Sequence, residues 1–153
     1  MNIAFFLTPK SQVAYLREGN SLRQGLEKMK RHGYACLPVL SRDGRFVGCV
    51  NEGDFLRKIL SMESATVKDL ERERIDGIIS DRYRPVRVTT TMEELLHYAI
   101  EQNFVPVMDD RDIFMGIITR KAMLAYWTQN VREMMAADGA EPAERLSGGQ
   151  EKP

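Results

Sequence analysis

The chain has 153 residues, enough for one compact unit or for two small halves that share a core. Apolar residues make up 43% and charged residues 29%, which is the balance of a globular protein. The 22 Lys and Arg residues balance the 22 Asp and Glu residues in charge. The composition therefore argues against broad attraction to nucleic acid or to an acidic membrane.

The first residues carry an apolar patch that is too short for a bilayer span and lacks the cationic leader of a signal peptide. We expect residues 1–11 to form a docking helix of one or two turns. Cys36 and Cys49 lie in apolar strand patterns, where free cysteine behaves as a small hydrophobe. Without a CxxC pair or a disulfide framework, the sequence predicts a reduced, cytoplasmic protein.

One construction occurs twice in the sequence. Pro38 aligns with Pro106 and Gly48 with Gly116 at one offset of 68 residues (106 − 38 and 116 − 48), and the apolar residues around them match. Upstream, each copy has a capping box, formed by Ser21 with Gln24 and by Thr91 with Glu94. We interpret the pattern as a tandem duplication.

The first copy, placed at residues 12–62, predicts alternating strands and helices. Its expected elements are an extended lead-in at 13–16, a helix from Ser21 to Gly33, strands at 35–40 and 45–50, and a helix capped by Asn51 with Phe55, Leu56, Ile59 and Leu60 on its inner face. Residues 63–84 are dense in charge but carry spaced apolar residues, which indicates a linker with short helical turns.

The second copy and its last helix, placed at residues 85–135, repeat this order. The expected elements are a strand at 85–88, a helix after Thr91, strands at 104–108 and 113–118, and a final helix with an apolar stripe. Residues 136–153 are small, polar and rich in Gly and Pro, so we expect a disordered tail.

The junction after the last strand is a candidate anion site. Here the strand runs through Gly116 into Thr119, which can cap the next helix, and Arg120 and Lys121 follow at once. A helix start offers unpaired N–H groups and partial positive charge, and arginine adds a donor fork suited to phosphate. The same residues could also be only a helix cap and solvated charges.

The β-α-β-β-α order and the proline-bearing buried strand in each copy resemble the cystathionine-β-synthase (CBS) domain pair, from about Gln12 to Trp127. Each copy also has a form of the G-φ-φ-[S/T]-x-x-[D/N] motif, with Asn51 at the hydroxyl position of the first and Ala122 at the last position of the second. The resemblance implies an α/β (α+β) fold in which two units pack through their sheets with pseudo-twofold symmetry. It also implies a non-enzymatic sensor that forms a homodimer and binds adenine nucleotides in two clefts between its units.

Within that family, the chain is similar to small stand-alone bacterial proteins that bind cyclic di-AMP, through residues 13–15, 19–22, 33–35, 38–40 and 116–121. This similarity implies that the ligand-binding residues are Gln12, Ala14, Tyr34, Ala35, Thr119, Arg120 and Lys121. It further implies a regulated partner among metabolic or stringent-response enzymes. The lead-in position that is basic in those proteins is Gln12 here, with Lys10 close by.

The two motifs differ at the position where a ribose would be recognised. The first keeps Asn51 and Asp54, whereas the second has Thr119 and replaces the carboxylate with Ala122. A carboxylate can accept from both neighbouring hydroxyls of a free ribose, but a cyclic dinucleotide has its 3′-oxygen tied in a phosphodiester. The second motif therefore favours cyclic di-AMP, and Asn51 and Asp54 mark a weaker second cleft.

The sequence thus predicts a regulatory protein whose ligand is cyclic di-AMP and which has no other cofactor. It carries no nucleophile–base set, Walker loop or metal-ligand spacing, so neither an enzyme nor a metal site is expected. Two alternatives stay open: an AMP, ADP or ATP energy sensor that uses Asp54, and a ligand-free dimeric interaction scaffold.

Overall fold

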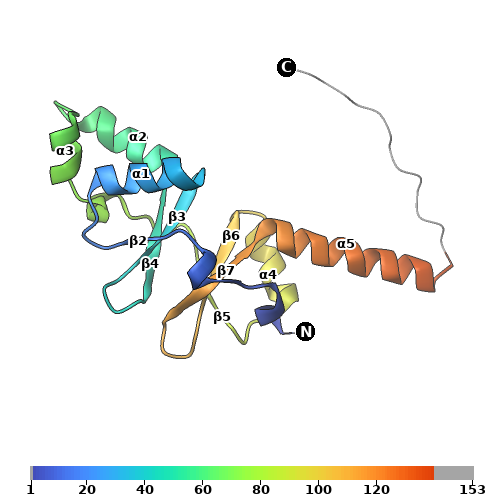
Figure 1. Cartoon of the computed structure of the whole chain (residues 1–153). Coiled ribbons are helices and arrows are strands. Elements are labelled where there is room, and N and C mark those ends of the chain that lie inside the picture. Colours follow the sequence, from blue (N-terminus) through green and yellow to red (C-terminus); the bar gives the residue numbers. More distant parts are fainter. Residues whose placement is uncertain (1, 140–153) are drawn as a thin grey trace, which may run out of the picture. The chain divides into compact units, whose positions relative to one another are not determined.

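The computed structural model describes residues 2–139 (Figure 1). These residues fall into a compact unit that ends at Met123 and a second unit that begins at Leu124, within the last helix. That helix runs to Ala137. The first two residues of the expected tail at 136–153 are therefore helical, and the tail from residue 140 onwards lies outside the described residues.

The two copies in the sequence form the same series of elements. The first series is β2 (Leu16–Arg17), α1 (Leu22–His32), β3 (Cys36–Leu40), β4 (Phe46–Asn51) and α2 (Glu52–Ser61). The second series is β5 (Val86–Arg87), α4 (Met92–Ala99), β6 (Phe104–Met108), β7 (Phe114–Thr119) and α5 (Arg120–Ala137). The mixed fold with a doubled β-α-β-β-α unit is confirmed.

The predicted capping residues begin and end the helices. Ser21 and Gln24 form a reciprocal capping box at α1, and Gly33 ends that helix with φ 68°, a left-handed conformation that glycine adopts without steric cost. Thr91 begins α4 in the same way, through Glu94. Local hydrogen bonding therefore fixes both helix starts independently of the core.

The duplication extends to the strand register. One sheet has the order β2-β3-β4 and the other the order β1-β7-β6-β5. Pro38 lies opposite Cys49 in the first and Pro106 opposite Ile117 in the second, positions that are again 68 residues apart. Both hairpins also shift register at the same place, between Val39 and Leu40 and between Val107 and Met108.

The two hairpins meet each other directly within the first compact unit. The Phe114 N–H donates to the Gly44 carbonyl oxygen at 2.9 Å, and Arg45 forms an isolated bridge with Ile113. The ring of Phe114 lies 6.4 Å from that of Phe46 and 6.5 Å from that of Tyr15. Aromatic packing and backbone pairing thus join the halves at the ends of their sheets.

The segment before the first half pairs with the second half. The sequence predicts a docking helix over residues 1–11, whereas the structure has a single 3-10 turn, η1 (Ile3–Phe6), then strand β1 (Thr8–Pro9) and a second turn, η2 (Lys10–Gln12). Strand β1 pairs antiparallel with β7, Pro9 opposite Gly116. The side chain of Ile3, the first residue of η1, is fully buried and anchors this turn.

The linker pairs with the first half. It contains α3 (Val67–Arg72) and η3 (Ile75–Ile78), in agreement with the predicted short helical turns. Beyond them, Ser80 exchanges two backbone hydrogen bonds with Cys49, at 2.9 and 2.8 Å. The edge of each sheet is therefore completed by the segment that precedes the other half.

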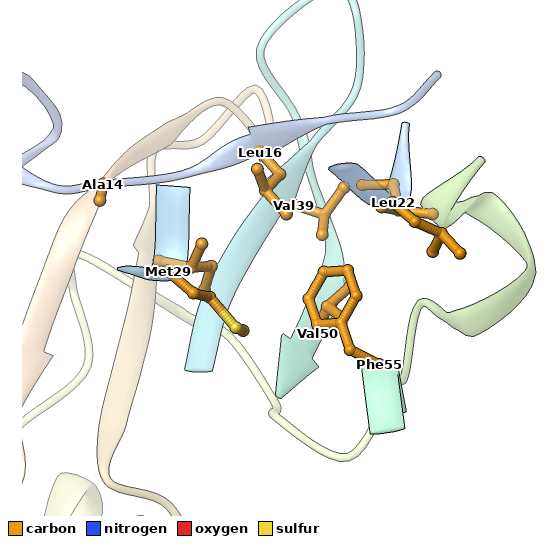
Figure 2. Packing of buried hydrophobic residues seen from close by; sticks show 9 residues of the cluster. Ala14, Leu16, Leu22, Met29, Val39, Val50 and Phe55 are labelled. Carbon is orange, nitrogen blue, oxygen red and sulfur yellow. The ribbon is translucent and has the colours of Figure 1, made fainter. Parts of the chain in front are cut away.

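The first half has its own core, in which side chains from β2, α1, β3, β4 and α2 converge (Figure 2). Phe55 is 1% exposed, and a Cβ added at Gly25 would lie 2.5 Å from its ring, so α1 approaches α2 closely here. The expectation that Leu56 and Leu60 also face inward is wrong, since they are 57% and 75% exposed. They lie one position further around α2 than Phe55 and Ile59, which places them on its outer side.

We expect Gly116→Ala to lower the free energy of unfolding by about 2 kcal/mol, because the new methyl group would overpack the β1–β7 pair. A Cβ there would lie 2.1 Å from the Thr8 carbonyl oxygen, and φ is 153°. Urea unfolding measures the change. The matched control is Gly77→Ala, where no atom lies within 4 Å, and an equal loss in both variants would contradict the prediction.

Candidate functional site

The junction of β7 and α5 forms a helix start with a side-chain cap. The Ala122 N–H donates to the Thr119 Oγ1 at 3.1 Å, so the threonine satisfies one of the free amides of the first turn. The capping role predicted for Thr119 is confirmed. The Arg120 N–H is also paired, with the Asn103 carbonyl oxygen, so the Lys121 N–H and the positive end of the helix dipole are the parts of this turn that could meet an anion.

Two cations stand at this helix start without a carboxylate partner. Arg120 is half-buried; its backbone N–H donates to the Asn103 carbonyl oxygen at 2.8 Å, and its Nε donates to that of Gln102 at 3.2 Å. Lys121 is exposed. Among residues 2–139, neither forms an ion pair. Because the carbonyl oxygens use only two of Arg120's donors, its Nη groups are left to bind an anion.

The lead-in residues reach the second half through strand pairing. Since β1 pairs with β7, the turn η2 that carries Gln12 packs against β7, and the Gln12 side chain is exposed. Ala14 is only 8% exposed and belongs to the core of the first half. Its methyl group therefore packs inward, which leaves the backbone as the part of Ala14 that could meet a ligand.

The start of β3 carries the remaining predicted residues. Tyr34 is 46% exposed and stacks on His32, with ring centroids 5.9 Å apart, while Ala35 is exposed and its carbonyl oxygen accepts from the Glu52 N–H at 3.0 Å. The Tyr34 ring is therefore solvent-exposed and packs on the His32 ring rather than in the core. In the described part of the chain, no hydrogen bond joins Tyr34 or Ala35 to the α5 helix start.

A polar chain nevertheless links the start of β3 to the start of α5. Cys36, next to Ala35, interacts with the hydroxyl of Tyr83, which accepts from the Asn103 N–H at 3.2 Å. Asn103 in turn accepts from Arg120. Burial raises the pKa of Tyr83, so the hydroxyl stays protonated. The linker residue Tyr83 therefore positions elements of both halves relative to the predicted site.

The first motif has a different electrostatic state. Asn51 and Asp54 form a reciprocal capping box at α2, with the Asp54 N–H donating to Asn51 Oδ1 at 2.8 Å and the Asn51 N–H donating to Asp54 Oδ2 at 2.9 Å. The Oδ1 of Asp54 accepts from Arg57 Nη2 at 2.8 Å and from Arg82 Nη2 at 2.7 Å. This carboxylate, only 10% exposed, is therefore already paired within the chain.

Arg82 is a residue that sequence reasoning missed. Leu16 and Val86 occupy equivalent strands at an offset of 70 residues (86 − 16), and the same offset makes Arg82 the counterpart of Gln12 (82 − 12). Comparison of the two lead-ins could have found it. The pair between Arg82 and Asp54 also shows that the lead-in of one half faces the motif of the other half.

The surface near Arg82 is hollowed. A cavity of about 650 Å³ lies between the linker and α4, lined by Arg82, Arg84, Thr90, Glu94, His97, Tyr98, Glu101 and Gln102. None of these residues was predicted.

Within the described residues, side chains do not gather in a group that could hold a metal ion, and no helix is long and apolar enough to cross a membrane.

The two cysteines are free and adjacent. Cys49 is 3% exposed and Cys36 is half-buried. A hydrogen bond with Cys49 lowers the pKa of Cys36, and burial raises the pKa of Cys49. The thiol pair lies beside Tyr83 and Asp54, at the centre of the network that connects linker and motifs.

A model of the CBS domain matches residues 6–61 and 75–128 of the chain. The chain belongs to the CBS domain family. The two matches coincide with the two halves of the fold, and they begin in the N-terminal segment and in the linker, the segments that exchange between halves. The chain is therefore a tandem pair of CBS domains.

One sequence relative and several solved structures are similar to the chain. Cyclic di-AMP receptor B of Bacillus subtilis (strain 168) is 22% identical over 129 residues, which cover 84% of this chain and 88% of that protein. A crystal structure of CbpB in complex with c-di-AMP matches with a TM-score of 0.78 at 20% identity, covering 90% of this chain and 91% of that chain. The complex of Listeria monocytogenes CbpB with c-di-AMP gives 0.74 at 22% identity, with coverages of 86% and 98%.

We expect Thr119→Ala to reduce the free energy of unfolding by about 1 kcal/mol, the usual contribution of a threonine cap. Thr119→Ser keeps an oxygen acceptor for the Ala122 N–H and should stay close to the wild type. Thermal and urea unfolding in the absence of nucleotide measure the difference. Equal destabilisation by both substitutions would mean that the threonine methyl group, rather than the cap, stabilises the junction.

Proposed function

We propose that the chain is a non-enzymatic receptor for cyclic di-AMP, which binds at the second-motif site. We define this site as Gln12, Ala14, Tyr34, Ala35, Thr119, Arg120 and Lys121. Binding would change the affinity of the receptor for a partner protein, and the receptor would act as a homodimer. Such a switch requires that the ligand favours one conformation or complex over another.

The observation that carries the proposal is the pair of uncompensated cations at the start of α5. Arg120 and Lys121 have no carboxylate partner among residues 2–139, and Ala122 leaves no negative charge beside them. A cyclic dinucleotide brings two singly charged phosphodiesters and no free vicinal diol. Cations, helix amides and a missing carboxylate together suit that combination of groups.

The relatives support the same ligand. Cyclic di-AMP receptor B is a protein of almost the same span as this chain, and CbpB structures with c-di-AMP share its fold. A receptor role also agrees with a site that has cations and a helix start but no nucleophile paired with a general base. We therefore prefer binding to catalysis as the activity of this site.

The homodimer has support from apolar side chains that the chain leaves uncovered. Leu56 and Leu60 form an outward row on α2, and Ile100 follows α4 with 80% of its surface exposed. Exposed apolar rows of this kind are buried when chains associate.

The partner protein would recognise a surface of the dimer that changes with the ligand. We propose that this partner is a metabolic or stringent-response enzyme.

The main alternative ligand is AMP or ATP, recognised by Asp54. The capping box and two arginine pairs already occupy that carboxylate, which weakens this alternative. A melting panel with cyclic di-AMP, cyclic di-GMP, AMP and ATP separates the ligands. At about 100 times its dissociation constant a ligand stabilises the fold by about 2.7 kcal/mol, so we expect a clear shift with cyclic di-AMP. A shift with AMP or ATP alone would overturn the proposal.

Arg120→Ala should weaken cyclic di-AMP binding at least tenfold, the loss expected when a charge-assisted hydrogen bond of about 1.5 kcal/mol or more is removed. The backbone bond from residue 120 to Asn103 is kept in this variant. Calorimetric titration measures the affinity. Arg132→Ala is the matched control, since Arg132 is an exposed arginine further along α5, and it should bind like the wild type. Equal affinities for all three chains would remove Arg120 from the site.

A further inference from the structure

The carboxylate of Asp54 has little hydrogen-bonding capacity left. A carboxylate accepts about four hydrogen bonds, two at each oxygen. Oδ1 accepts from Arg57 and Arg82, at 2.8 and 2.7 Å, and is saturated. Oδ2 accepts from the Asn51 N–H at 2.9 Å, which leaves one position. With the side chain only 10% exposed, water cannot easily replace these partners.

A free ribose presents two neighbouring hydroxyl groups, and the simplest recognition by a carboxylate gives one hydrogen bond to each oxygen. In the structure only Oδ2 has a vacant position. If Arg82 were absent, one position would be vacant on each oxygen, which is the arrangement that a vicinal diol requires. The presence of Arg82 therefore closes the Asp54 carboxylate to the diol, and the absence of Arg82 would open it.

We propose that Arg82 is a specificity-determining residue, which closes the Asp54 carboxylate to nucleosides that carry a free ribose diol. The first motif would then contribute no nucleoside site, although it retains the carboxylate. This inference extends beyond the proposed function, because it concerns the other motif and its test does not require cyclic di-AMP.

The structure holds Arg82 in place before any ligand arrives. Its Nε donates to the Ser80 Oγ at 2.8 Å, and its backbone N–H donates to the same oxygen at 3.2 Å. Ser80 is itself fixed by its two backbone bonds with Cys49. A side chain already ordered in this way loses little conformational entropy when it pairs with Asp54, so the pair is favourable although Arg82 is 56% exposed.

Arg57 also fills a position on Oδ1, but it is not held from outside α2 as Arg82 is. It pairs with Asp54 from one turn further along α2 and is 65% exposed, so it moves with its own helix and can turn toward solvent. Arg82 comes from the linker, 28 residues away, and crosses from the lead-in of the second half to the motif of the first. At the second-motif site the equivalent positions are Gln12 and Ala122, which cannot form such a pair.

The test is the affinity of wild type and Arg82→Ala for adenosine and for 2′-deoxyadenosine, measured by ligand-observed NMR titration. Adenosine carries the diol but no phosphate, so the loss of a positive charge does not itself weaken its binding. We expect adenosine to bind Arg82→Ala at least about tenfold more tightly than wild type, the effect of one regained hydrogen bond to a charged group. Binding of 2′-deoxyadenosine should not change, and Asp54→Ala added to Arg82→Ala should abolish the gain.

Arg84→Ala is the matched control. It removes the same charge two residues away, from an exposed side chain without an ion pair in the described chain, and the Arg84 backbone bonds to Gln102 remain. A gain in both arginine variants, no gain in a folded Arg82→Ala, or Asp54-dependent adenosine binding to wild type would each overturn the inference. Failure of wild type to bind cyclic di-AMP would remove the proposed function but leave this comparison intact.

Discussion

The reciprocal exchange of edge segments is the constraint on which the rest of the structure depends. Strand β1 comes before the first half yet pairs with β7 of the second, and Ser80 comes before the second half yet pairs with Cys49 of the first. Glycine permits both approaches, since a Cβ would lie 2.1 Å from the Thr8 carbonyl oxygen at Gly116 and 2.5 Å from that of Ser80 at Gly48. The exchange brings each lead-in to the motif of the opposite half.

The same backbone then supports two different electrostatic outcomes. At the first motif the lead-in supplies Arg82 and the helix supplies Asp54, and the two neutralise each other. At the second motif the lead-in supplies Gln12 and the helix supplies Arg120 and Lys121, which have no carboxylate partner among residues 2–139. Duplication thus provided two copies of one geometry, and substitution of a few side chains made them chemically unequal.

Much of the fold follows from the sequence because its signals are local or repeated. Capping boxes at Ser21 and Thr91, the glycine at Gly33 and the common offset of 68 residues each specify structure within a short window or by comparison of two windows. The cap and the cations at Thr119–Lys121 were found for the same reason. Their position at a helix start requires only the local order of strand, glycine and threonine.

The features that escaped prediction depend on contacts between distant segments. Thr8 and Pro9 become a strand only because β7 offers an edge to them, and Arg82 acquires its role only through Asp54. The outward position of Leu56 and Leu60 also escaped, since an apolar row beside the buried row of α2 has the same helical periodicity.

The exchange of edge segments has a consequence for how the molecule folds. Thr8 and Ile117 are 109 positions apart along the chain (117 − 8), so the second sheet is completed only when both ends of the module have been synthesised. Long-range closure of this kind slows folding and makes the module a single cooperative entity. Either half taken alone would lack the segment that completes the edge of its sheet, because that segment precedes the other half.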